Sequence, residues 1–161
     1  MKQVLLPNRY LMVPRTLIFL RNEDKILLIK GSPDKKIWPG LYNGIGGHIE
    51  RGENLISAAE RELLEETGIA GVDLSLRGII FIDVNQNNGI TLYIFEGFVE
   101  SKTIKNGPEG EIEWINTEEI HNYPLVEDLY ELIPRIISNE DKTIIGRYYY
   151  ENENLITDFN N

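Results

Sequence analysis

The sequence has no cysteine and only two histidines, His48 and His121, among its 161 residues. The missing cysteines exclude a disulfide framework, a cysteine-ligated zinc site, an iron–sulfur cluster and a thiol nucleophile. Neither histidine has a partner in the sequence pattern that favours metal ligation, and no other feature supports a Ser–His triad. These absences disfavour sulfur and imidazole chemistry.

Basic residues are also scarce, with 16 Lys and Arg against 26 Asp and Glu and a formal net charge of -10. Such a surface repels a polyanion, which argues against long nucleic acids as partners. A small phosphorylated ligand is compatible with this charge if a divalent cation screens it. No apolar run approaches the roughly 20 residues of a membrane span, and Met1 to Arg9 do not resemble a signal peptide. We expect a soluble cytoplasmic protein, either a monomer or a homodimer.

Strand patterns dominate the chain. Two aliphatic runs around a polar tetrad, Arg15–Leu20 and Lys25–Lys30, predict a β-hairpin. Further strands are predicted at Tyr42–Ile45, Leu76–Val84, Ile90–Val99 and Glu111–Ile115, with a closing hairpin of Thr143–Tyr150 and Leu155–Phe159. No linker separates two cores, so we expect one domain over residues 1–161.

Two segments carry helical patterns. Asn54–Thr67 is rich in Ala, Leu, Glu and Arg, begins at a capping Asn and stops before Gly68, a residue preferred just past a helix end. Leu125–Ser138 predicts a second amphipathic helix, which Pro134 weakens. Many strands with two helices, not in strict alternation, predict an α+β fold with a mixed sheet.

The first helix gathers carboxylates on one face. At 100° per residue, Glu62, Glu65 and Glu66 fall within one arc, where like charges repel. A different arc, available to the core, carries Ile56, Leu63 and Leu64. An acidic helix face is tolerated when it is fully solvated, which is the usual case, or when a cation occupies it.

Two features favour the cation. Glu53 precedes the helix and can converge on the same ion, and Gly46 and Gly47 let the backbone approach that end closely. Oxygen ligands select a hard cation, so Mg²⁺ is expected, with Mn²⁺ as a substitute. Mg²⁺ held by a few carboxylates commonly binds substrate phosphates.

The segment from Gly47 to Ile69 reads GHIERGENLISAAERELLEETGI and resembles the Nudix box. The matching positions are Gly47, Glu53, Arg61, Glu62, Glu65, Glu66 and Gly68, with aliphatic Leu63 and Ile69. Chance agreement of the seven fixed residues in one window is about 10⁻⁸ at average composition. The resemblance implies an α/β/α sandwich with a strand–loop–helix site that hydrolyses a nucleoside diphosphate linked to another moiety.

The resemblance also implies roles for these residues. Glu62, Glu65 and Glu66 are expected to ligate the metal, with the Gly47 carbonyl as an additional ligand, and Glu65 and Glu66 are catalytic candidates. Arg61 is expected to orient the acids by pairing. Glu53 is expected to support the helix start or an outer-shell metal.

Beyond the box, the similarity extends to MutT-type enzymes, including the animal 8-oxo-dGTP diphosphatases. It implies that Asn43 reads a purine, although Asn43-Gly44 is equally typical of a turn. It implies that Glu109 is a remote metal ligand or general base, whereas the alternatives are a solvated loop acid or a replacement by Glu111 or Glu113.

The same similarity covers the start of the second predicted helix. There it implies that Glu127 and Asp128 grip the base, whereas acids that merely favour the helix dipole are the plainer reading. The aromatic stacking residue of those enzymes is Leu125 here, a departure that weakens the case for tight 8-oxoguanine recognition.

Three functions follow from these patterns. The leading hypothesis is a Mg²⁺-dependent pyrophosphohydrolase that cleaves a (d)NTP, such as an oxidised purine nucleotide, to a nucleoside monophosphate and pyrophosphate. The second is hydrolysis of ADP-ribose or another nucleoside diphosphate conjugate. The third, a nucleotide-binding module without turnover, is disfavoured because every glutamate of the box is present.

Overall fold

The computed structural model describes residues 4, 7–100, 104, 110–138 and 142–160. The strands form one eight-stranded sheet with the order β3-β2-β1-β5-β4-β7-β8, in which β6 pairs with β2. The strands are β1 (Leu11–Asn22), β2 (Lys25–Gly31), β3 (Tyr42–Asn43), β4 (Leu74–Asp83), β5 (Asn88–Phe98), β6 (Gly110–Asn116), β7 (Ile144–Glu151) and β8 (Asn154–Asn160). The helices are α1 (Leu55–Thr67), the 3₁₀ helix η1 (Thr117–Asn122) and α2 (Leu129–Ile137).

Strand β1 runs parallel to β5 along almost its whole length. The predicted hairpin of β1 with β2 is confirmed only next to the turn, where Arg21 pairs with Ile26 and Asn22 with Lys25. The two strands then separate, because β1 exchanges hydrogen bonds with β5 on one side and with the 45–47 segment on the other. Parallel and antiparallel pairs therefore coexist, which confirms the mixed sheet.

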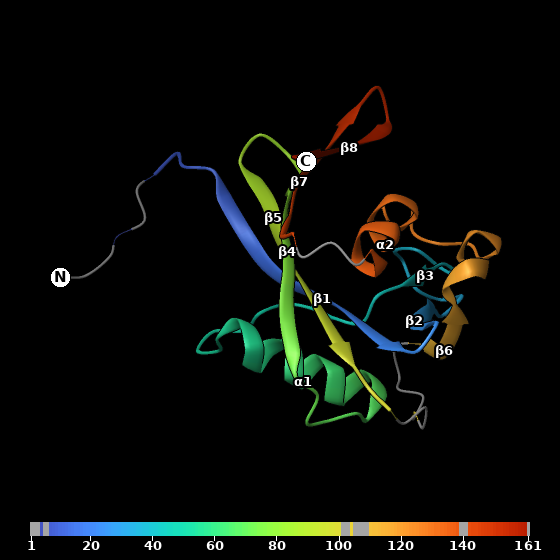
Figure 1. Cartoon of the computed structure of the whole chain (residues 1–161). Coiled ribbons are helices and arrows are strands. Elements are labelled where there is room, and N and C mark those ends of the chain that lie inside the picture. The colour runs from blue at the N-terminus through green and yellow to red at the C-terminus, as the bar shows by residue number, and fades with distance from the viewer. Residues whose placement is uncertain (1–3, 5–6, 101–103, 105–109, 139–141, 161) are drawn as a thin grey trace.

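The sheet separates two apolar cores, each covered by one helix (Figure 1). Leu17 and Phe19 of β1 pack under α2, whereas Ile18 and Leu20 face α1. This alternation follows from the two-residue period of a strand. Both faces of the central strands are thus buried, which confirms the expected α/β/α sandwich.

Helix α1 has the expected ends. The Asn54 side chain accepts hydrogen bonds from the backbone of Ile56 and Ser57, at 3.0 Å each, while the Ser57 hydroxyl accepts one from the Asn54 backbone in return. Gly68 ends the helix in the left-handed region at φ 73°. The predicted core arc was wrong at two positions, because Leu63 is 1% exposed but Ile56 and Leu64 are 41% and 51% exposed.

Helix α2 begins four residues later than predicted. Leu125 forms a parallel bridge with Tyr42 instead of a helical turn, and the Val126 amide donates to the Tyr42 carbonyl at 3.0 Å. This bridge holds the residues before α2 in an extended path. Pro134 lies inside the helix, which nevertheless continues to Ile137.

The closing hairpin is confirmed as β7 and β8, paired from Ile145–Asn160 to Glu151–Asn154. Strand β7 adds to the sheet beside β4 in parallel orientation. Within the described ranges, no helix combines the length and the apolar character needed to cross a bilayer.

Candidate active site

The glycine segment before α1 lies against β1. The amides of Thr16 and Ile18 donate to the carbonyls of Gly47 and Ile45, at 2.8 and 2.6 Å. Gly46 has φ 147°, and a Cβ there would collide with the Thr16 backbone. A Cβ on Gly47 would collide with the Glu62 carboxylate. Glycine at both positions therefore lets the backbone touch β1 on one side and an acid of α1 on the other.

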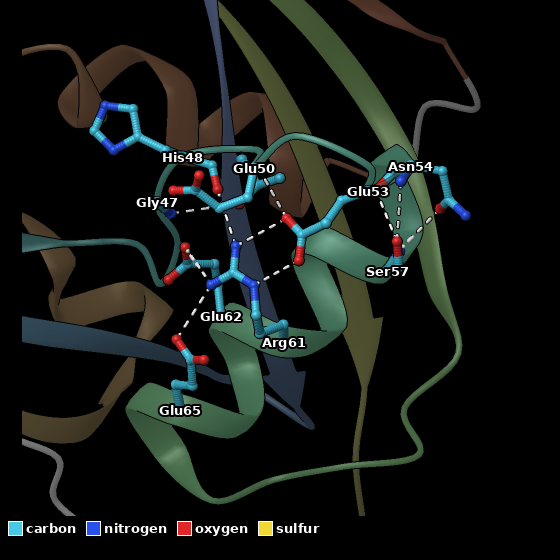
Figure 2. Close-up of polar contacts among 10 residues, drawn as sticks. Gly47, His48, Glu50, Glu53, Asn54, Ser57, Arg61, Glu62 and Glu65 are labelled. Carbon is cyan, nitrogen blue, oxygen red and sulfur yellow. Dashed lines mark hydrogen bonds and ion pairs between the residues drawn. The ribbon is translucent and has the colours of Figure 1, made fainter.

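Arg61, in the middle of α1, is the centre of a polar network that joins this helix to the loop before it (Figure 2). Its guanidinium donates to Glu53 at 2.7 and 3.0 Å, to Glu62 at 2.9 Å and to Glu65 at 3.1 Å. It also donates to the His48 carbonyl at 3.0 Å. One cation thus ties three acids of the box to each other and to the loop before the helix.

Glu53 joins the network from outside the helix. Besides its pair with Arg61, it accepts a hydrogen bond from the Glu50 amide at 2.9 Å, which closes the turn before α1. Hydrogen bonding to Arg61, and then to this amide, lowers the pKa of Glu53 to about 2. Hydrogen bonds to Glu53, and then to Glu62, raise the pKa of Arg61. Glu53 therefore stays charged and connects the loop to the helix.

Glu66 lies apart from the Arg61 network. Its side chain is 9% exposed and accepts a hydrogen bond from the Gly46 amide at 3.3 Å. Whereas Glu65 is more than half exposed on the helix surface, Glu66 lines a hollow in front of the sheet. The acids of the predicted arc thus face two different surroundings.

The oxygen donors on α1 and in the loop before it fit a hard divalent cation. It consists of the carboxylates of Glu62, Glu65 and Glu66 and the Gly47 carbonyl, which has a second lone pair beyond its bond from Thr16. In the part of the chain that the structure describes, no three Asp, Glu or His side chains form a ready-made metal cluster. Oxygens of Glu62 and Glu65 instead contact the Arg61 guanidinium, at 2.9 and 3.1 Å. The metal roles of these residues stay predictions.

Two adjoining hollows open beside the glycine segment. The larger, of about 550 Å³, contains Glu66 on its wall and is called the Glu66 hollow. The smaller, of about 200 Å³, is lined by Glu127 and Asp128 and is called the Asp128 hollow. Both share the wall residues Arg15, Trp38, Asn43, Gly44, Gly46 and Ile90. The structure therefore brings Asn43 together with Glu127 and Asp128, next to the hollow that reaches Glu66.

The polar groups of the Asp128 hollow differ in exposure. Glu127 is exposed, whereas Asp128 is half-buried and its side chain makes no capping hydrogen bond to α2. Burial, and then the nearby charge of Glu127, raises the pKa of Asp128 to about 6. Asn43 lies in β3, and its side-chain oxygen accepts a hydrogen bond from the Gly44 amide at 2.8 Å. The Asn43 amide nitrogen carries two further donors.

Aromatic and basic groups complete the hollows. Leu125 is buried and does not line them, whereas Trp38 borders both and Tyr148 and Tyr150 border the Asp128 hollow. Arg15 was missed from the sequence because a single arginine in a strand carries no local signal. Glu109 lies outside the described residues. Of the alternatives to it, Glu113 accepts a hydrogen bond from the Tyr42 hydroxyl at 2.7 Å.

Comparison with known proteins decides the family. The NUDIX domain model matches residues 12–136, which is most of the chain. The chain belongs to the Nudix family. A mouse relative, the oxidized purine nucleoside triphosphate hydrolase, is 26% identical over 145 residues, covering 89% of this chain and 90% of the relative.

Solved Nudix structures agree in fold. The MutT protein of Bacillus halodurans superposes with a TM-score of 0.76 at 22% identity, covering 91% of this chain and 98% of that one. The NUDIX domain of Shewanella oneidensis NrtR, crystallised with ADP ribose, gives 0.67 at 16% identity, over 78% and 86% of the two chains. Nudix proteins are hydrolases that act on pyrophosphate bonds of nucleotides, generally with divalent metal ions, and this chain is an enzyme of that class.

Proposed function

We propose that this Nudix enzyme is a Mg²⁺-dependent pyrophosphohydrolase that cleaves a purine (d)NTP to the nucleoside monophosphate and pyrophosphate. Oxidised purine nucleotides such as 8-oxo-dGTP are the first candidates, because the mouse relative is named for that substrate class. The observation that carries the proposal is the pair of adjoining hollows, one bordered by Asp128 and Asn43 and the other by Glu66.

The two hollows divide the work of binding. Asp128 and Glu127 offer oxygens to the edge of a base, and the Asn43 amide nitrogen offers donors. Trp38 supplies an aromatic wall where Leu125 cannot. A base held there would direct its phosphates along the shared wall towards Glu66.

The α1 end would then carry the chemistry. Glu62, Glu65, Glu66 and the Gly47 carbonyl would hold the cation, which supplies charge neutralisation of the phosphates and a lower pKa for an attacking water. Arg61 keeps Glu62 and Glu65 in place, and Glu53 anchors Arg61 to the loop. Holding the cation and positioning its ligands would therefore both depend on α1 and the loop before it.

Product analysis tests the proposal. The enzyme is incubated with dGTP, 8-oxo-dGTP, dATP and ADP-ribose, with Mg²⁺ and then with a chelator. Release of pyrophosphate and a monophosphate from a triphosphate, abolished by the chelator, is the expected result. Hydrolysis that continues unchanged without divalent cations would contradict the metal assignment.

Glu66→Gln examines the helix end directly. The substitution removes the negative charge of the one box acid that borders the hollow, so turnover should fall about 10²–10⁴-fold. Glu60→Gln on the exposed side of the same helix is the matched control and should keep wild-type turnover. Equal activities of the two variants would remove Glu66 from the site.

A nucleoside diphosphate conjugate is the second candidate. The Glu66 hollow is larger than the Asp128 hollow and extends to Lys35 and Lys36, which leaves room for a group beyond the diphosphate. The ADP-ribose complex of the Shewanella oneidensis NUDIX domain makes this conjugate the one to assay. AMP and ribose 5-phosphate as the main products, with triphosphates left intact, would favour it.

A further inference from the structure

Arg15 is a half-buried arginine that takes no part in the Arg61 network or in the ion pairs of the sheet. Among the residues that the structure describes, Arg21 and Arg77 pair with Glu96 at 3.0 and 3.2 Å, and Arg61 pairs with three acids. No salt bridge is formed by Arg15 with any described carboxylate, although the chain carries a net charge of -10. Its positive charge therefore stays available to a ligand.

The place of Arg15 in the sheet is fixed from both sides. It pairs with Leu92 of β5 and bridges to His48, the residue after Gly47. The next two residues, Thr16 and Leu17, also border the Asp128 hollow. Arg15 thus lies in the part of β1 that borders the hollows, one residue before Thr16, whose amide donates to the Gly47 carbonyl.

Arg15 borders both hollows, and this decides what it can contact. A group that fits the Asp128 hollow and another that reaches Glu66 must be joined across the shared wall. Lys35 and Lys36 line only the Glu66 hollow and are exposed. Arg15 is the cation at the junction, whereas these lysines lie further along the larger hollow.

We propose that Arg15 binds the phosphate that adjoins the nucleoside of the substrate. A guanidinium has five N–H donors in a planar fork that matches two phosphate oxygens, and such charge-assisted pairs are stronger than neutral ones. The ligand class is therefore a nucleoside 5′-phosphate, whatever group follows that phosphate. The assignment relies on the proposed function only for the nucleotide nature of the ligand.

Binding without turnover tests this assignment. Calorimetric titrations in a chelator compare deoxyguanosine with dGMP, and adenosine with AMP, on the wild type, Arg15→Gln, Arg15→Lys and the exposed control Arg51→Gln. Arg15→Gln should weaken each monophosphate about tenfold and leave each nucleoside unchanged. Arg15→Lys should recover part of the loss, because it keeps the charge but not the fork. The control should match the wild type.

The outcomes separate this inference from the enzymatic one. Equal losses for nucleoside and monophosphate, or no loss for the monophosphate, would overturn the role of Arg15, as would a wild type that binds neither monophosphate at millimolar concentration. A wild type that binds them but hydrolyses no nucleotide with Mg²⁺ would overturn the proposed function and leave this result standing. Thermal melts of each variant confirm that it is folded.

Discussion

The two halves of the site are built in opposite ways. The α1 half comes from one uninterrupted stretch, in which Arg61 reaches back eight residues to Glu53 and forward one and four residues to Glu62 and Glu65. The hollows are assembled from β1, β3, the 31–41 loop, β5, β7 and the residues before α2. The proposed chemistry would thus be encoded locally, whereas ligand selection would depend on the packing of the whole fold.

This contrast predicts two kinds of mutational effect. Changes in the α1 half should reduce turnover for every nucleotide alike, since all candidate substrates carry the linked phosphates on which this half would act. Changes in the hollows should alter binding and preference while turnover is kept.

After Glu66→Gln, the next largest of these effects is expected for Arg61→Ala. Without the guanidinium, Glu53, Glu62 and Glu65 lose their common partner and repel one another. Loss of groups that orient metal ligands typically costs 10–100-fold, so kcat should fall by about this factor for all nucleotides. Steady-state kinetics on the substrate panel measure it, with Arg51→Ala as the exposed control. A loss confined to one nucleotide would break the contrast between the two halves.

A smaller and more selective effect is expected for Asp128→Asn. We expect kcat/KM for the preferred nucleotide to fall about tenfold, through KM, because a hydrogen bond to a charged group is exchanged for a neutral one. Asp128 is neutral below pH 6 and charged above it, since its pKa is raised to about 6 by burial and then by Glu127. The wild-type KM should therefore change between pH 5 and 7, whereas that of the variant should not. Kinetics across this range decide the matter.

The raised pKa of Asp128 also predicts how the free energy of unfolding changes with pH. A carboxyl whose pKa is higher in the folded than in the unfolded protein, about 3.9, stabilises the fold at low pH and loses that contribution as pH rises from about 4 to 6. Urea unfolding of the wild type and Asp128→Asn should diverge by up to about 3 kcal/mol as pH rises through this window, with the variant gaining. Parallel curves would show that Asp128 titrates normally.

The smallest effect is expected for Tyr148→Phe. The Tyr148 side chain is 2% exposed, and its hydroxyl has no hydrogen-bond partner in the described part of the structure. Removing an unpaired buried hydroxyl should leave the free energy of unfolding unchanged or raise it by up to about 1 kcal/mol. Tyr42→Phe is the matched control, because that hydroxyl donates to Glu113 at 2.7 Å and its loss should cost about 1 kcal/mol. Denaturant unfolding of both variants compares them.

Local signals predicted the α1 region well. The Asn54 cap, the Gly68 end and the family followed from the segment 47–69 alone, because caps and motifs act over a few residues. The helical wheel misplaced Ile56 and Leu64, since their exposure depends on how far the sheet extends beneath α1. Periodicity identifies an apolar face but not the area available to cover it.

Long-range pairing explains the other errors. Nothing in Leu125–Asp128 indicates that Leu125 pairs with Tyr42, more than eighty positions earlier in the printed numbering, so the helix was started too soon. The parallel partner of β1 is equally remote, and an adjacent hairpin was the natural expectation. Arg15 borders the Glu66 hollow only because β1, β3 and β5 come together in the fold.

Strand β1 sets the alignment of the two halves of the site. Successive side chains of β1 point to opposite faces. Arg15 borders both hollows, and Thr16, which also borders the Asp128 hollow, accepts a hydrogen bond from the Gly47 amide at 3.4 Å through its hydroxyl. A slip of one residue would exchange these faces and also turn Ile18 and Leu20 out of the core under α1. The two apolar layers therefore fix the register of β1, and loosening either layer would shift Arg15 relative to the acids of α1.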